Sequence, residues 1–358
     1  MKILVISLAG IGDTLLATPL LRVLRERNPE AIIDVAVMYA GAKDILHGNP
    51  HVNTIYFQNL IKAKPMSNLG FIGQLRKQKY DISINTHPQS KREYRVIARM
   101  IGAGLRLSHR HECSTWVDSL LVNREIDQDY KVHCVQNNLN LLQLLGHPLP
   151  SEAVDCELFF TPEESNWAED WVRRPELQGK KLVAVHVGSG KTKNLILKRW
   201  PVENYVDLLR RLLAAHAKIQ VVLFGGPEEQ EDNEQIWKTV QDSRLVPGKS
   251  RSLKQAAALL KKCDVFLSVD NAFMHLAAAM KVPEQVVIES PTFNKTIEPW
   301  QRPFRLVPNP MVAGKNLEYY LYDGKDIKGS REHLLACMRS ITPEMVLKEI
   351  SAALSGEP

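Results

Sequence analysis

The sequence lacks the features that mark membrane-spanning, disulfide-bonded and metal-binding proteins. None of its apolar runs approaches the roughly 20 residues needed to cross a bilayer. The unbroken apolar run before the first glycine, residues 3–6, is too short for the core of a signal peptide. The five cysteines are odd in number, lie far apart and include no C-x-x-C pair, which argues against a disulfide framework and a zinc site. We therefore expect a protein of the reducing cytoplasm that contains no metal.

Two common nucleotide-binding motifs are also absent. Leu15 stands where the third glycine of a G-x-G-x-x-G dinucleotide fingerprint would be. Gly190-Lys191-Thr192 resembles the end of a Walker loop, but the spacing before it is wrong. No nucleic-acid motif and no interleaved aromatic residues accompany the basic segments, so we expect no nucleic-acid partner.

Composition and pattern predict two α/β domains. The chain has 358 residues, of which 44% are hydrophobic and 24% charged, and it is too long for one hydrophobic core. Short β-branched runs alternate with helical patterns, as in doubly wound parallel sheets. The predicted strands are Lys2–Leu8, Ile32–Met38, Asn53–Phe57, Asp81–Thr86, Leu182–His186, Gln220–Phe224, Val265–Ser268 and Gln285–Glu289.

The expected fold is therefore two Rossmann-like doubly wound domains that face each other across a cleft. Between the strands we predict a first helix after Gly12-Asp13-Thr14, and then helices at about 132–145, 162–172, 202–216, 228–239, 253–261, 272–280 and 343–354. The predicted domains are residues 1–160 and 161–335, and residues 336–358 form a helix that docks on one of them. Ligands of such sheets bind beyond the carboxyl ends of the strands.

Asp13 is the first candidate for chemistry. It follows Gly10 and Gly12 between the first predicted strand and helix, where backbone amides face a ligand. Two interpretations remain open: an acid that caps the first turn of the helix, and a general base at the cleft.

A second candidate is the passage from His186 to Pro201. Ser189, Lys191, Lys193 and Lys198 follow a predicted strand, and small residues with several cations can hold a diphosphate. A third is the segment Asp270-Asn271-Ala272 with His275, at a strand end and helix start that suit a sugar hydroxyl and a phosphate. Asn271 is equally suited to capping the helix, and His275 to contacting a nearby loop. Thr292, in Ser290-Pro291-Thr292, is a candidate contact for a base or ribose, and a simple turn remains the alternative.

Charge is concentrated in residues 60–110, which hold eleven Lys and Arg against two acids, a local balance of +9, whereas the whole chain carries +6. Solvated helix faces explain such a stretch as well as an anion-binding surface does. An anionic saccharide and a phospholipid surface would both use this field. We take Arg92, Arg95 and Arg99 as candidates for binding an anionic ligand. Asp127-Gln128-Asp129 matches a metal-binding D-x-D pattern, but we expect it to cap a helix.

Together, these motifs resemble the heptosyltransferase family, glycosyltransferases of lipopolysaccharide assembly that use ADP-heptose. The likeness covers nearly the whole chain. It is carried by Gly10, Gly12-Asp13-Thr14, Pro19, Tyr80-Asp81, His133, Lys198-Arg199-Trp200-Pro201, Phe224-Gly225-Gly226-Pro227-Glu228, Leu253, Asp270, Met274-His275-Leu276-Ala277-Ala278-Ala279 and Cys337-Met338-Arg339-Ser340-Ile341-Thr342-Pro343.

The resemblance implies the GT-B architecture, in which residues 1–160 bind the acceptor and residues 161–335 bind the nucleotide sugar, so that Arg92, Arg95 and Arg99 are candidates for gripping an anionic acceptor. It also implies an inverting, metal-independent transfer to a lipid-linked saccharide, with peripheral contact at the inner face of the cytoplasmic membrane. It further implies that Asp13 is the catalytic base, with Gly12 and Thr14 beside the donor. By the same resemblance, Lys198 meets the diphosphate, and Asp270 with the following helix holds the donor.

This chain departs from the family pattern in two places. Asn271-Ala272 stands where a small hydroxyl residue and a glycine are usual, and Glu289-Ser290 stands where a glycine precedes the Pro-Thr turn. A transferase for another nucleotide sugar and a non-catalytic saccharide- or nucleotide-binding protein on the same scaffold are therefore alternative hypotheses.

Overall fold

The computed structural model describes residues 1–190, 193–322 and 325–356. The chain forms two compact units. The first contains Met1–Phe159 together with Tyr322–Lys325, and the second contains Phe160–Leu321 with Asp326–Pro358.

The first unit is built on a six-stranded sheet in the order β3-β2-β1-β4-β5-β6, and all its strand pairs are parallel. Its strands are β1 Lys2–Ser7, β2 Ile32–Val37, β3 Thr54–Phe57, β4 Ile82–Asn85, β5 Leu105–Arg110 and β6 Arg124–Asp127. Its helices are α1 Ile11–Leu15, α2 Thr18–Arg27, α3 Ala40–Leu46, α4 Pro65–Lys77, α5 Arg92–Ile101, α6 Trp116–Leu121 and α7 Cys134–Asn140, which continues into the 3-10 turn Leu141–Leu145.

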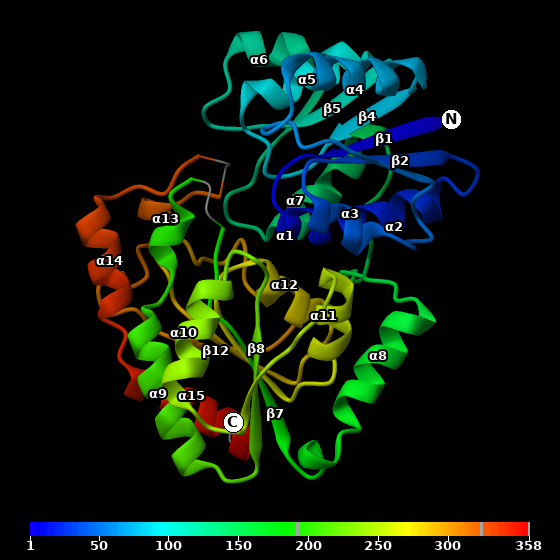
Figure 1. The fold of residues 1–358 in the computed structure, drawn as a ribbon. Coiled ribbons are helices and arrows are strands. Elements are labelled where there is room, and N and C mark those ends of the chain that lie inside the picture. Colours follow the sequence, from blue (N-terminus) through cyan, green and yellow to red (C-terminus); the bar gives the residue numbers. More distant parts are fainter. Residues whose placement is uncertain (191–192, 323–324, 357–358) are drawn as a thin grey trace. The chain divides into compact units, whose positions relative to one another are not determined.

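Helices cover both faces of this sheet. The neighbouring helices α4, α5 and α6 lie on one face, and α1, α2, α3 and α7 lie on the other (Figure 1). Both faces of β1 are therefore buried, and Ile3 to Ser7 are all at most 1% exposed. This two-sided burial explains why β1 is an almost continuous apolar run. Helix α5 ends where Gly102 adopts φ +78°, a left-handed conformation that suits glycine.

The second unit repeats this plan with the order β12-β11-β10-β7-β8-β9, again all parallel. Its strands are β7 Lys181–His186, β8 Ile219–Phe224, β9 Leu245–Pro247, β10 Val265–Val269, β11 Glu284–Ile288 and β12 Arg305–Val307. Its α-helices are α8 Pro162–Val172, α9 Val202–Ala215, α10 Gln230–Val240, α11 Leu253–Leu260, α12 Ala272–Ala279, α13 Asn316–Tyr319, α14 Arg331–Arg339 and α15 Pro343–Ser355, and 3-10 turns cover Pro175–Leu177 and Leu195–Lys198.

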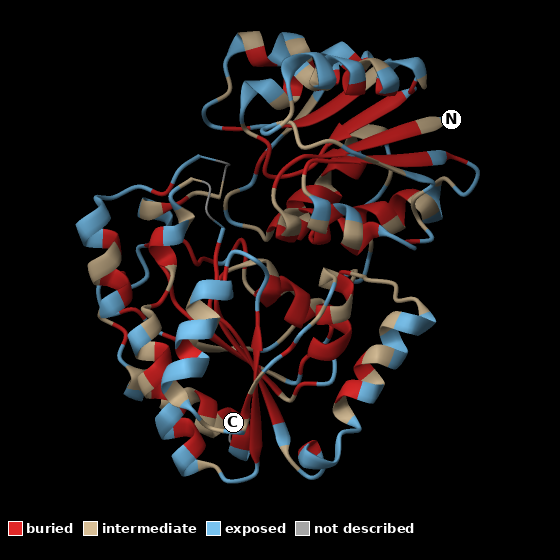
Figure 2. Cartoon of the chain, in the orientation of Figure 1, coloured by how far each residue is buried: buried red, intermediate tan, exposed pale blue. Residues whose placement is uncertain are grey.

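In the second unit α9, α10 and α15 pack on one side, and α8, α11 and α12 pack together on the other (Figure 1). Figure 2 shows the strands buried and the outward helix faces exposed. The C-terminal helix α15 closes the core, since its residues Val346 and Ile350 are buried against strand residues such as Val286. Trp200 ties the tail to this unit by donating to the carbonyl of Ile341 at 2.9 Å.

Every predicted strand is confirmed to within about two residues, and so are the six helices predicted in the second unit, whereas α13 and α14 were not predicted. Two helix predictions need correction. The first helix begins at Ile11, earlier than expected, and is broken between Leu15 and Thr18. The predicted helix at 132–145 is α7 followed by a 3-10 turn. Strands β5, β6, β9 and β12 were not predicted.

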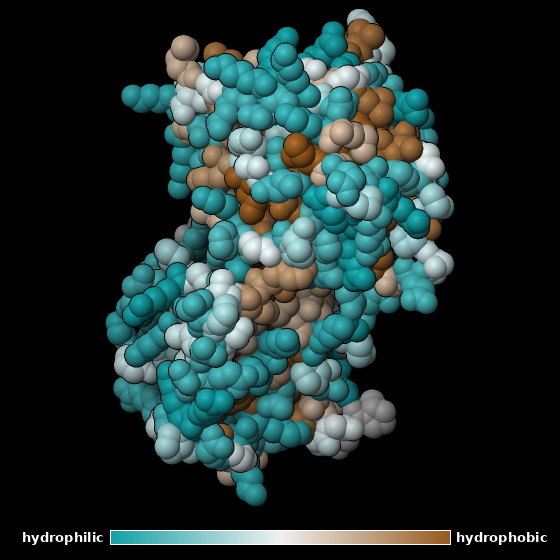
Figure 3. Space-filling model, turned by 90° about the vertical axis from the view of Figure 1, so that its right-hand side faces the viewer, coloured by the Kyte–Doolittle hydropathy of each residue, from teal (hydrophilic) through white to brown (hydrophobic). Residues whose placement is uncertain are grey.

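Among the described residues, every helix is too short or too polar to span a bilayer. In the view of Figure 3 most of the surface is hydrophilic, and apolar groups emerge in small areas, some of them on the first unit in the upper part of the picture.

Candidate functional site

Asp13 stands in the loop that follows β1. It is the third residue of α1, is partly buried, and accepts a hydrogen bond from the amide of Gly10 at 2.6 Å. A β-carbon on Gly10 would stand 2.9 Å from Oδ2 of Asp13, so a larger residue at position 10 would shift this carboxylate. The capping interpretation of Asp13 is thus confirmed, since the hydrogen bond from Gly10 fixes one oxygen of the Asp13 carboxylate. The role of Asp13 as base stays a prediction.

Thr14 and Gly12 shape the same loop. Both are buried. The hydroxyl of Thr14 lies 3.0 Å from that of Ser7 in β1 and 3.2 Å from the carbonyl of Gly10. These bonds hold the loop against the end of β1, whereas the predicted donor contacts of Gly12 and Thr14 remain predictions.

The second oxygen of Asp13 accepts a hydrogen bond from Tyr322, which lies 309 positions later in the sequence. Tyr322 belongs to the short segment that groups with the first unit. The sequence offered no local signal for this contact. Both oxygens of the carboxylate are thereby oriented, one by a backbone amide and one by a phenol.

Three buried histidines extend from Tyr322 along the ends of β4 and β5. The ring centroid of His87 lies 5.7 Å from that of Tyr322 and 5.8 Å from that of His109, and His111 follows at 6.3 Å from His109. Burial lowers the pKa of His109 to about 4 and that of His111 to about 3, and it also lowers the pKa of His87, to which neighbouring histidines add. This layer is therefore uncharged near neutral pH.

In the second unit, Lys198, Asp270, Ser290 and Thr292 form one buried network. Lys198 donates to Asp270 at 2.6 Å, and its ammonium also lies 3.3 Å from the hydroxyl of Thr292. Thr292 donates to Asp270 at 2.8 Å, and Ser290 donates to the other carboxylate oxygen. All four side chains are at most 6% exposed.

Sheet topology explains how this network forms. Asp270 follows β10, Ser290 and Thr292 follow β11, and these parallel strands are neighbours. Lys198 ends the 3-10 turn that comes after β7, on the other side of β10. The sequence predicted separate ligand contacts for Lys198, Asp270 and Thr292, but in the structure they bind one another. Their roles toward a ligand stay predictions.

Asn271 begins α12, and its capping interpretation is confirmed. Its amide oxygen accepts from Phe273 at 2.8 Å and from Met274 at 3.1 Å, and its nitrogen donates to the carbonyl of Gly188 at 2.9 Å. The same nitrogen lies 3.2 Å from Nδ1 of His186, whose pKa is lowered to about 3 by burial and by Arg199. Asn271 therefore joins the loop after β7 to the start of α12.

The other predicted residues near α12 and β7 are placed as follows. Ala272 is the first residue of α12, and His275 is buried in its first turn. Ser189 is buried, and its hydroxyl donates to the carbonyl of Leu195 at 2.8 Å. Lys193 is partly buried with φ +58°, while Lys191 lies outside the described residues.

Glu229 and Arg199 form a second buried centre that the sequence did not identify. Arg199 donates to Glu229 and to the carbonyl of Ser189, both at 3.0 Å. Glu229 also accepts from the amide of Gly226 at 3.0 Å. A β-carbon on Gly188 would stand 2.2 Å from the Glu229 carboxylate, so any larger residue there would displace the Glu229 side chain. This pair fixes the loop after β7. Its signals in the sequence were the Lys198-Arg199 motif and the motif Phe224-Gly225-Gly226-Pro227-Glu228, which directly precedes Glu229.

The acid before Ser290 points away from the network. Glu289 accepts from the amide of Asn309 at 2.6 Å and is buried. Its carboxylate is thus used by the backbone after β12, so it does not oppose a phosphate beside Thr292.

A family model now identifies the chain. The model of glycosyltransferase family 9 (heptosyltransferase) matches residues 69–319, most of both units. The chain belongs to glycosyltransferase family 9. It is 27% identical to lipopolysaccharide heptosyltransferase 2 of Salmonella typhimurium over 100% of this chain and 99% of that protein.

Two solved structures have the same fold as this glycosyltransferase. A family 9 glycosyl transferase from Veillonella parvula matches with a TM-score of 0.76 and 20% identity, covering 99% of this chain and 97% of that one. The E. coli ADP-heptose lps heptosyltransferase II matches with a TM-score of 0.71 and 22% identity, covering 100% and 99%. The GT-B class predicted for the two α/β units is thereby confirmed.

The prediction for Arg95 in this glycosyltransferase is wrong. Arg95 is 1% exposed, and its guanidinium donates to the carbonyls of Asp118 and His109 and to Glu125 at 2.5 Å. It stabilises the interior and has no surface from which to grip an acceptor. Arg92 is exposed and pairs with Asp118 at 2.8 Å, and Arg99 is exposed on α5. These two remain candidates for the acceptor.

The capping role expected for the D-x-D segment is also wrong. Asp127 ends strand β6 and pairs with Arg110 of the neighbouring strand at 2.6 Å, while α7 is capped by His133. In the described part of the chain, no group of three or more His, Cys, Asp or Glu side chains is arranged to hold a metal ion.

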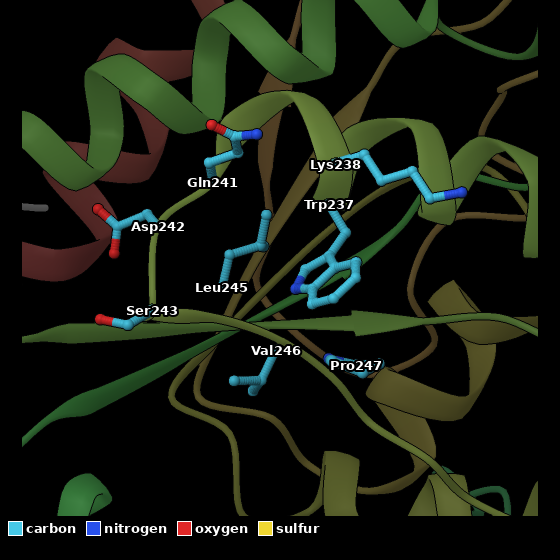
Figure 4. Close-up of a pocket in the computed structure, with 8 residues that line it drawn as sticks. All are labelled: Trp237, Lys238, Gln241, Asp242, Ser243, Leu245, Val246 and Pro247. Atoms are coloured by element: carbon cyan, nitrogen blue, oxygen red, sulfur yellow. The ribbon is translucent and has the colours of Figure 1, made fainter.

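Figure 4 shows a pocket on the second unit, away from the residues discussed above. It lies between the end of α10 and the edge strand β9, and its lining includes Trp237, Asp242 and Leu245. None of the predicted site residues lines it.

Proposed function

We propose that this glycosyltransferase moves a heptose from ADP-heptose to a lipopolysaccharide core or related envelope saccharide at the cytoplasmic face of the membrane. The names of the Salmonella relative and the E. coli structure support heptose transfer, and the latter name includes ADP-heptose. The observation that carries the chemical part of the proposal is the Asp13 carboxylate, which is oriented at the carboxyl end of β1 by Gly10 and Tyr322.

In the proposed reaction Asp13 accepts the proton of the acceptor hydroxyl. The hydroxyl oxygen forms a bond to the anomeric carbon while the bond from that carbon to the diphosphate breaks, and ADP leaves with the electron pair. Attack opposite the leaving group inverts the anomeric centre. Tyr322 donates to one carboxylate oxygen, so an acceptor hydroxyl would replace or share that hydrogen bond.

The charge that develops on the diphosphate needs compensation, which we assign to the second unit. An ammonium has three N–H donors. Two of them are directed at Asp270 and Thr292, which leaves one for a phosphate oxygen. Lys193 and the amide of Ala272 at the start of α12 are further donors. These groups supply positive charge, and we propose that the transfer needs no metal.

The identity of the donor sugar needs a test of its own, because Asn271-Ala272 departs from the family pattern. The side chain of Asn271 binds the start of α12 and the carbonyl of Gly188. A donor phosphate beside Ala272 would therefore meet a backbone amide but no side-chain hydroxyl from this position. Thermal shift with a panel of ADP-, UDP- and GDP-sugars tests the choice. Stabilisation by ADP-heptose above the others is expected, and stabilisation by a UDP-sugar alone would refute ADP-heptose as donor.

The variant Asp13→Asn tests the mechanism. Loss of a general base should reduce turnover by about 10²- to 10⁴-fold, whereas the affinity for ADP, measured by calorimetry, should stay unchanged. Glu30→Gln is a matched control, since Glu30 is an exposed acid of the same unit. Turnover of Asp13→Asn equal to that of the control would exclude Asp13 as the base.

A further inference from the structure

The two oxygens of the Asp13 carboxylate have different surroundings. Oδ2 lies against the backbone of its own loop, where it accepts a hydrogen bond from the amide of Gly10 at 2.6 Å. Oδ1 accepts a hydrogen bond from the phenol of Tyr322. Proton transfer requires that a substrate hydroxyl come within hydrogen-bond reach of the base. The hydroxyl of Tyr322 therefore binds the carboxylate oxygen that is turned away from the loop, the one better placed for a substrate.

Tyr322 reaches Asp13 with an uncommon backbone conformation. Its φ is +53°, in the left-handed region that few bulky residues adopt. Such a conformation is unfavourable by itself and persists only where the surrounding contacts hold it. Residues of this kind are concentrated at active sites and ligand-binding sites. The contacts of the Tyr322 side chain, rather than a local preference of the chain, therefore hold its phenol in place.

The ring of Tyr322 packs against His87, which follows β4. Their ring centroids lie 5.7 Å apart, with 45° between the ring planes. His87 is 1% exposed, and burial lowers its pKa, so it presents an uncharged surface to the phenol. The amide of His87 donates to Asn138 of α7 at 2.9 Å, and Asn138 donates to the carbonyl of Leu16 at 3.3 Å. Since Leu16 directly follows α1, the support of Tyr322 and the helix that carries Asp13 are held together.

Two further tyrosines lie at the same edge of the sheet as Asp13. Tyr39 follows β2, and Tyr94 lies in the first turn of α5, after β4. Strands β2 and β4 are the two neighbours of β1, so the residues that follow these three strands meet. Both tyrosines are partly buried and pack on the same apolar cluster. Burial raises the pKa of Tyr94 to about 12, with smaller contributions from Tyr39 and Asp13, which are therefore close to it.

We propose that the Tyr322 hydroxyl shields Asp13 from water and is displaced by a saccharide hydroxyl. This inference rests on the proposed function, because it names the residue that decides between two nucleophiles for one base. If water reacted, it would give a proton to Asp13, and its oxygen would form a bond to the anomeric carbon. The bond from that carbon to the diphosphate would break, and ADP would leave with the electron pair. The donor would then be lost as free heptose and ADP.

The shield discriminates because the two nucleophiles differ in binding energy. A water molecule offers Asp13 only the kind of hydrogen bond that the phenol already makes, and the phenol is held beside the carboxylate. A saccharide makes further contacts with the protein, and their binding energy can offset displacement of the phenol. A hydrogen bond to a charged group shifts such an equilibrium by at least about tenfold. Tyr322 should therefore slow donor hydrolysis about tenfold and weaken acceptor binding by a similar factor.

Release of ADP from ADP-heptose without any acceptor tests the shield. Tyr322→Phe removes the hydroxyl and keeps the ring that packs on His87, and it should hydrolyse ADP-heptose about tenfold faster than wild type. The matched control is Tyr319→Phe, which removes a phenol that lies 2.8 Å from Nε2 of His333. This control should hydrolyse the donor as wild type does. In Asp13→Asn/Tyr322→Phe the gain should disappear, because the water then has no base.

Transfer kinetics separate a shield from a residue that only orients the base. The acceptor used is a deacylated lipopolysaccharide core oligosaccharide. Tyr322→Phe should lower the KM for this acceptor about tenfold, because the hydroxyl no longer competes with the phenol, and should leave kcat unchanged. A lower kcat combined with unchanged or slower hydrolysis would show that Tyr322 only orients Asp13, and would overturn the proposal.

The outcomes distinguish this inference from the proposed function. Transfer to the acceptor, with equal hydrolysis by wild type and Tyr322→Phe, would overturn the shield and leave the proposed function standing. Faster hydrolysis that persists in the double variant would also overturn the shield, because the water would then react without Asp13. Absence of both transfer and hydrolysis of ADP-heptose in every variant and in wild type would refute the proposed function, and the shield with it.

Discussion

Replacing Lys198 by methionine removes one charge of the buried pair at the centre of the second unit. Lys198 is 6% exposed and Asp270 is 3% exposed, so water compensates neither charge. In Lys198→Met the Asp270 carboxylate keeps the hydroxyls of Ser290 and Thr292 but loses its cation. We expect the variant to unfold more easily and to bind ADP more weakly.

The magnitude follows from burial. Removing one partner of a buried ion pair destabilises a protein by about 3–5 kcal/mol, because the remaining charge stays desolvated. For a unit of this size, each kcal/mol lowers Tm by roughly 2–4 °C. The transition of the second unit should therefore fall by roughly 6–20 °C.

Calorimetry on four variants (Lys198→Met, Asp270→Asn, their combination and Lys261→Met) distinguishes a charge effect from a packing effect. Lys198→Met combined with Asp270→Asn removes both charges and should recover part of the lost Tm. Lys261→Met removes an exposed lysine of the same unit and should leave Tm unchanged. A loss below about 1 kcal/mol in Lys198→Met, or a double variant as unstable as the sum of the single ones, would refute a coupled buried pair.

Two further predictions concern the first unit. Arg95→Ala should destabilise it by about 3–5 kcal/mol in urea unfolding, because Glu125 and two carbonyls lose a buried donor. The control Arg99→Ala, on the exposed face of α5, should change the free energy of unfolding by less than about 0.5 kcal/mol. A raised acceptor KM with unchanged stability in Arg95→Ala would contradict the structural role of Arg95. Stability should also fall with acid. The folded unit holds His109 with a pKa of about 4 and His111 with a pKa of about 3, and the pKa of His87 is likewise lowered, whereas the unfolded chain protonates histidine near pH 6.5. This contribution is complete above about pH 6.5 and is lost progressively toward pH 4 and below, so urea midpoints that stay constant from pH 7 to 5 would contradict neutral buried imidazoles.

The sequence alone determined the fold class and the places where ligand-binding loops leave the sheets. Strands such as β1 and β10 are buried on both faces, so their continuous apolar runs mark them without tertiary information. Strand β5, Leu105–Arg110, was not predicted because it contains the polar residues Arg106, Ser108 and His109. These side chains are buried, and their hydrogen-bond partners are provided only by the folded interior of the unit. The edge strand β6 was missed because it presents charged residues to water.

Local pattern also located Asp13, Lys198 and Asp270, because each follows a strand or its loop. Only the tertiary structure decided which groups these side chains contact. The Lys198–Asp270 pair joins residues 72 positions apart, and Tyr322 reaches Asp13 across 309 positions. The burial of Arg95 could not be predicted either. The helical period marks the inward face of α5 but does not reveal that the Glu125 carboxylate packs against that face. Periodicity reflects burial along one element, whereas partners depend on how elements meet.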